Sequence, residues 1–95
     1  DNLEGNNVIT NLVLNSSQTY TFTRLNDETS HPFYISDIGR NQEPVNITIT
    51  GDGSYDNGIS GSQTFTLSFN SSFNSNSIYY YCTIHSIMVS QISVI

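Results

Sequence analysis

The chain contains no lysine and no alanine, and its only cationic side chains are Arg24 and Arg40. Against them stand eight carboxylates, so the formal net charge is -6. Nucleic acids and anionic membrane surfaces are bound by basic faces, and we therefore expect the protein to bind neither. The acidic balance would suit a cationic partner, although solubility alone also explains it.

Other scarce features exclude further classes of structure. The sequence has no run of 18 apolar residues, so no membrane-spanning helix is expected. A single cysteine cannot form a disulfide within the chain. The missing alanine, and the lack of apolar residues at helical spacing over three turns, argue against long helices. The chain starts at Asp1 without a basic and apolar leader, and we expect it to be a mature or excised segment.

Alternation of apolar and polar residues predicts short β-strands along most of the chain. The expected strands are residues 8–14, 19–25, 46–50, 64–69, 78–82 and 91–95. Clusters of Gly, Asn, Asp and Ser separate them, and residues 70–77 are expected to form a long loop. About seven to eight short strands predict an all-β fold, a Greek-key β-sandwich or barrel, in a single domain over residues 1–95.

The rarest residue types are gathered near the C-terminus. Cys82 is the only cysteine, Met88 the only methionine, and His31 and His85 are the only histidines. Two imidazoles, one thiolate and one weak thioether form the ligand set that is typical of a blue-copper electron-transfer centre. Zinc is the competitor, because a cysteine and two histidines also suit it, but Zn²⁺ has little use for a thioether.

The expected strand at 78–82 directs Cys82 inward together with Ile78 and Tyr80. Tyr81 then points to the other side, where it offers either a surface route for an electron or plain sheet packing. His31 is expected at the start of a different strand, approaching from the opposite sheet edge. The apolar residues near the exposed edge of His85 are expected to form a docking rim: Pro32, Ile84 and Ile87.

The pattern Tyr81-Cys82-x-x-His85-x-x-Met88, preceded by a distant His31-Pro-Phe-Tyr-Ile and followed by a final strand, resembles the cupredoxins. It is also similar to plastocyanin-like domains found alone or within extracellular and virion-associated proteins. The resemblance implies one copper ion (Cu⁺/Cu²⁺) per chain, bound by His31, Cys82, His85 and Met88. It further implies one-electron transfer with a redox partner protein.

Two residues depart from the family pattern. Pro32 stands where many cupredoxins have an asparagine whose side chain ties the two ligand segments together, so another group must make that connection. Ser90 stands where a glycine is often found, two residues after the methionine. Neither change removes a ligand.

Two further functions fit the same residues: a structural or adhesive module of a larger extracellular or virion protein, and copper capture or delivery. We do not expect an enzyme, since copper oxidases and nitrite reductases need additional ligands and only two histidines are present. We expect a monomer in an extracellular or periplasmic setting, or one associated with a virion. Three N-glycosylation sequons are compatible with secretion: Asn15, Asn46 and Asn70.

Overall fold

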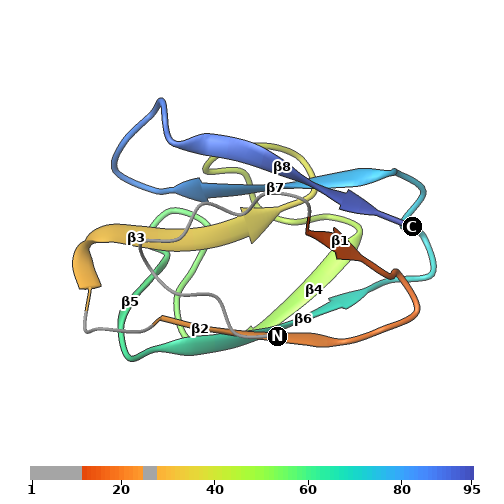
Figure 1. Ribbon diagram of the computed structural model, residues 1–95, viewed down its shortest axis with the longest axis horizontal. Coiled ribbons are helices and arrows are strands. Elements are labelled where there is room, and N and C mark those ends of the chain that lie inside the picture. Colours follow the sequence, from red (N-terminus) through yellow and green to blue (C-terminus); the bar gives the residue numbers. More distant parts are fainter. Residues whose placement is uncertain (1–11, 25–27) are drawn as a thin grey trace.

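Hydrogen bonding between strands divides the protein into two sheets. The structure is a computed structural model that describes residues 12–24 and 28–95. Within these residues the strands are β1 Val13–Leu14, β2 Tyr20–Thr23, β3 Glu28–Ser36, β4 Ile47–Gly51, β5 Ile59–Gly61, β6 Thr64–Phe69, β7 Ser77–Cys82 and β8 Val89–Val94 (Figure 1). One sheet has the order β1-β8-β7-β3-β5 and the other β2-β6-β4. The predicted all-β sandwich is confirmed.

The connections between strands are of the Greek-key kind. Among the described strands, only β7 and β8 follow one another in sequence and also pair with one another. The other consecutive strands lie in different sheets, so the chain crosses repeatedly from one layer to the other. This winding brings β3 and β7, which are far apart in sequence, into direct antiparallel pairing.

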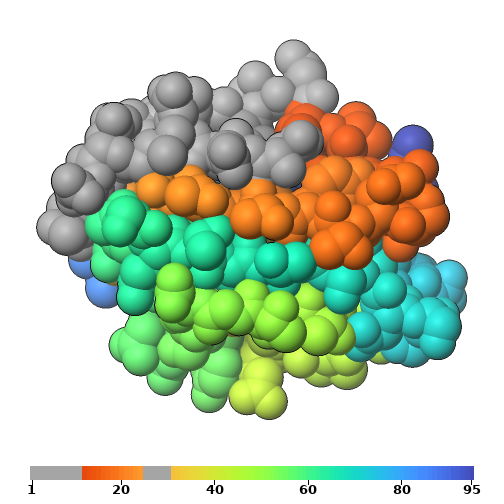
Figure 2. All heavy atoms as spheres, turned by 90° about the horizontal axis from the view of Figure 1, so that it is seen from below, coloured from red at the N-terminus to blue at the C-terminus, as the bar shows by residue number. Residues whose placement is uncertain are grey.

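Apolar residues at alternate strand positions form the core between the sheets. Phe22, Phe65 and Leu67 point inward from the smaller sheet, and each is at most 1% exposed. The Phe65 ring reaches across to the larger sheet, where its centroid lies 5.0 Å from that of Tyr34. The intervening positions are mostly threonines, which suit a solvated strand face. Figure 2 shows this outer face, with β2, β6 and β4 side by side.

Most strand predictions match the structure. Strands were expected at 19–25, 46–50, 64–69, 78–82 and 91–95, and β2, β4, β6, β7 and β8 occupy these segments. The predicted loop before the cysteine-bearing strand spans residues 70–76. Residues 8–11 and 25 of the predicted strands lie outside the described residues. No helix in the described part of the chain is long and apolar enough to cross a membrane.

Candidate metal centre

The β7–β8 hairpin carries the cysteine and the second histidine at its closed end. β7 ends at Cys82 and β8 begins at Val89, so residues 83–88 form the connecting loop (Figure 1). Two backbone hydrogen bonds shape this loop. The Cys82 N–H donates to the Met88 carbonyl at 2.9 Å, and the Met88 N–H donates to the His85 carbonyl at 3.0 Å. The loop is therefore a compact turn, and Cys82 lies at the end of β7 where the turn begins.

The first histidine reaches the same place from the neighbouring strand. Phe33 of β3 pairs directly with Cys82, and His31 lies two residues earlier on β3. The register of β3 against β5 shifts between Glu28 and Phe33, an irregularity of the kind that re-aims side chains. Pro32 fits such a position because it has no N–H to give to a ladder.

The expectation that His31 would come from the opposite sheet edge is wrong. β3 and β7 are neighbours within one sheet, and β3 begins at Glu28 rather than at the histidine. The sequence pattern could not show this pairing, because it joins residues about fifty positions apart.

Three ligand atoms converge at this point. The Cys82 Sγ lies 3.2 Å from the Nδ1 of His85 and 4.0 Å from the Nδ1 of His31. The two Nδ1 atoms are 3.3 Å apart. Cys82 itself is buried, with 5% of its surface exposed, and both imidazoles lie closer to the surface. Within the described residues, this is the one group of three His, Cys, Asp or Glu side chains close enough to hold a metal ion.

The separations fit one ion shared by all three atoms. A nitrogen at about 2.0 Å and a sulfur at about 2.3 Å from one ion lie about 3.2 to 4.0 Å apart when the angle between them is roughly 95° to 135°. Two nitrogens at about 2.0 Å lie 3.3 Å apart at an angle of about 110°. The donor set is also chemically suited, since thiolate and imidazole bind borderline and soft metals. The described residues therefore form a site that could hold a metal ion.

The surface around the loop is apolar. Ile84 is 61% exposed, Ile87 91% and Met88 42%. Pro32, which directly follows His31 in the sequence, is half-buried. Exposed apolar residues are thus concentrated on the ligand loop, where the docking rim was predicted. Met88 shares the loop with His85, and its role as an axial ligand stays a prediction.

A backbone contact joins the two ligand-bearing segments. The Thr83 N–H donates to the Pro32 carbonyl at 3.0 Å. This bond connects the two segments without any contribution from the side chain of residue 32. Cys82 directly precedes Thr83, and His31 directly precedes Pro32. The bond therefore links the residue that bears the thiol to the residue that bears the imidazole through short stretches of main chain.

Sequence reasoning missed the side chains that hold this connection. Arg40 donates from Nε to the Cys82 carbonyl at 3.1 Å and from Nη2 to the Thr83 carbonyl at 2.8 Å. The Asn41 side-chain amide also donates to the Thr83 carbonyl, at 3.2 Å. The one available signal was the scarcity of cations, which makes either arginine worth attention.

The loop between β4 and β5 supports the site from a further direction. Its Asn57 carbonyl accepts the Thr83 hydroxyl at 3.2 Å. Gly58 has a φ of 70° and lies so close to the histidine segment that an added Cβ would be 2.9 Å from the Pro32 carbonyl carbon. Only glycine combines this backbone conformation with so close an approach.

Tyr81 is a packing residue. It is 2% exposed, and its hydroxyl donates to the Tyr55 carbonyl at 2.9 Å. Burial raises the pKa of Tyr81 far above its ordinary value. The proposed surface electron route through Tyr81 is therefore wrong, and the alternative of plain sheet packing is correct.

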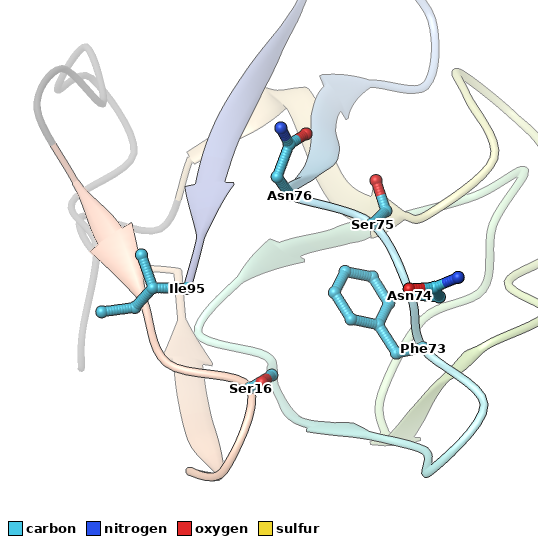
Figure 3. Close-up of a pocket in the computed structure, with 6 residues that line it drawn as sticks. All are labelled: Ser16, Phe73, Asn74, Ser75, Asn76 and Ile95. Carbon is cyan, nitrogen blue, oxygen red and sulfur yellow. The ribbon is translucent and has the colours of Figure 1, made fainter.

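A shallow hollow lies away from the metal centre, where the β1–β2 turn, the end of β8 and the loop before β7 meet. Figure 3 shows Ser16 and Ile95 on one side of it and residues 73–76 on the other. Its lining side chains are hydroxyl, amide and apolar groups, with no His, Cys, Asp or Glu among them. This lining offers no metal ligand of the kind that gathers around Cys82.

Comparison with protein-family models, curated proteins and solved structures finds no match for the chain. The likeness to cupredoxins thus stays a prediction from the residue pattern, and the function is argued from the site.

Proposed function

We propose that the protein binds one copper ion through His31, Cys82 and His85, with Met88 as a weak fourth ligand, and transfers single electrons between partner proteins. The observation that carries this proposal is the convergence of two imidazole nitrogens and one thiol sulfur within 4.8 Å of one another. Copper supplies one-electron chemistry by moving between Cu⁺, which favours thiolate and thioether, and Cu²⁺, which accepts imidazole.

The chain's own residues contribute a site that needs little rearrangement. Cys82 is fixed at its N–H by the Met88 carbonyl and at its carbonyl by Arg40. His31 is held on a strand of the same sheet. Ligands fixed by the fold impose similar positions on both oxidation states, and a small geometric change on reduction favours rapid electron transfer.

The apolar surface of the ligand loop gives a partner access to the centre. Ile84 and Ile87 lie on either side of His85 in sequence and are largely exposed. Burial of such a patch would stabilise a short-lived complex without long-range electrostatic attraction, and the net charge of -6 would favour a cationic partner.

Titration of the protein with Cu²⁺ tests the proposal. We expect saturation at one ion per chain, with an intense thiolate-to-copper band in the visible spectrum that a chemical reductant bleaches reversibly. Cys82→Ser should abolish the band and leave the far-ultraviolet circular dichroism unchanged, because a hydroxyl cannot replace the soft thiolate. Ser90→Ala, on the exposed strand that follows the loop, is the matched control and should keep the band.

A metal-competition experiment distinguishes a zinc site from a copper site. A structural zinc site would bind Zn²⁺ tightly through the cysteine and the two histidines and would show no redox response. Stoichiometric Zn²⁺ that excess Cu⁺ does not displace would therefore contradict the copper proposal.

A further inference from the structure

Arg40 lies on the loop that connects β3 to β4, and this loop is closed at its base. Both carboxylate oxygens of Asp37 accept backbone N–H groups, from Val45 and Asn46, each at 2.9 Å. The loop therefore has a fixed base, and Arg40 and Asn41 reach from it to the ligand loop. The contact joins residues that are 42 positions apart in the chain.

The guanidinium holds one particular peptide unit. The Cys82 carbonyl, which accepts from Arg40 Nε, and the Thr83 N–H, which donates to Pro32, belong to the same planar peptide group. Arg40 thus fixes one end of this plane and the histidine strand fixes the other. The second guanidinium bond, to the Thr83 carbonyl, fixes the next peptide unit as well. An arginine is suited to this task because its donors form a rigid planar fork.

The same side chain places a permanent positive charge beside the centre. Arg40 is one of two cations in a chain of net charge -6, and it is bonded to the carbonyl of the residue that bears the thiol. A fixed positive charge near a metal favours the oxidation state with the lower charge.

We propose that Arg40 is a positioning residue of the metal centre: it fixes the Cys82–Thr83 peptide unit that couples the two ligand segments, and its charge favours the reduced metal. The first part concerns the metal-free chain. The second part rests on the proposed copper-binding function.

Three variants separate geometry from charge. Arg40→Met removes both the fork and the charge, and Arg40→Lys keeps the charge but cannot bond two carbonyls in the same way. Gln18→Glu is the control for net charge. It lowers the net charge by one unit, as Arg40→Met does, but at an exposed side chain on the β1–β2 turn.

Amide hydrogen exchange of the metal-free protein tests the positioning role. Hydrogen bonds to charged groups contribute about 1.5–3 kcal/mol, so we expect the Thr83 amide to exchange at least about tenfold faster in both Arg40 variants. In the same two variants, the Leu67 amide in β6 should exchange at the wild-type rate. In Gln18→Glu, the Thr83 amide should also exchange at the wild-type rate. Wild-type exchange at Thr83 in Arg40→Lys would overturn the positioning role, and this variant decides the matter if Arg40→Met does not fold.

The reduction potential of the copper-loaded protein tests the role of the charge. We expect a lower potential in Arg40→Met, a value close to wild type in Arg40→Lys, and no shift in Gln18→Glu because solvent and salt screen a distant exposed charge. Equal potentials in the wild type and Arg40→Met would overturn this part. If the wild-type chain bound no copper, the proposed function would fail, while the exchange rates of the metal-free chain would still decide whether Arg40 positions the loop.

Discussion

Gly58 and Gly61 form a matched pair that measures how closely the β4–β5 loop packs on the histidine segment. Both residues have left-handed backbone angles, with φ of 70° and 61°. They differ in their surroundings. An added Cβ at Gly58 would lie 2.9 Å from the Pro32 carbonyl carbon and 3.0 Å from the Phe33 nitrogen, whereas at Gly61 nothing lies within 4 Å.

Both alanine variants carry the cost of a left-handed backbone, but only Gly58→Ala also has a cost of steric overlap. Left-handed backbone costs a residue with a Cβ about 1–2 kcal/mol, and the effect of alanine on the unfolded chain is the same in both variants. At Gly58 the new methyl group must also push main-chain atoms apart by roughly half an ångström to reach ordinary contact distances of about 3.5 Å. Overpacking of this kind costs about 1–3 kcal/mol. Gly58→Ala should therefore be less stable than Gly61→Ala by about 1–3 kcal/mol.

Urea unfolding followed by far-ultraviolet circular dichroism measures this difference, with equal m-values as evidence that the unfolded states are alike. The displaced main chain is the one that carries His31 and accepts the Thr83 N–H, so Gly58→Ala should also weaken Cu²⁺ binding. Gly61→Ala should bind Cu²⁺ as the wild type does. Equal losses of stability in the two variants, or weaker Cu²⁺ binding in both, would refute the argument from close packing.

Other changes give outcomes of known direction. Met88→Gln should lower the reduction potential, because a harder oxygen ligand favours Cu²⁺, and Met88→Leu should raise it; voltammetry that finds equal potentials for Met, Gln and Leu would remove Met88 from the centre. Tyr81→Phe should cost about 0.5–1.5 kcal/mol in urea unfolding, since it deletes the hydrogen bond to the Tyr55 carbonyl, and should leave the visible band unchanged. Burial raises the pKa of Tyr34 and of Tyr81. The unfolded chain ionises these phenols near their ordinary pKa of about 10 while the folded chain keeps them neutral, so the free energy of unfolding should fall as pH rises above about 10. Unfolding curves that coincide at about pH 8 and about pH 11 would contradict the expected fall in the free energy of unfolding.

The strand pattern of the protein could be predicted from its sequence because each strand carries its own alternation. On β6, Phe65 and Leu67 are buried, whereas Thr64 at the start of the strand is exposed and Thr66 is only partly buried, as period-two spacing requires. β5 was missed because it has three residues, Ile59–Gly61, which is too short for alternation to be seen.

The three residues of the candidate metal centre could also be picked out from the sequence, but their arrangement could not. Rarity and spacing identified Cys82 and His85, and the structure brings His31 to them. The strand that carries His31 was expected on the other sheet edge, because a periodic pattern says which face a residue takes and nothing about which strand it meets. Arg40 was missed for the same reason, since its role depends on a contact across 42 residues.

X-ray absorption at the copper edge, measured on the protein loaded with one equivalent of Cu²⁺, tests the central claim most directly. The scattering reports which atoms surround the metal without reference to the rest of the molecule. A centre built from His31, Cys82 and His85 predicts one sulfur and two imidazole nitrogens as the nearest neighbours, with the sulfur lost in Cys82→Ser. A first shell of nitrogen and oxygen alone in the wild-type protein would contradict the account.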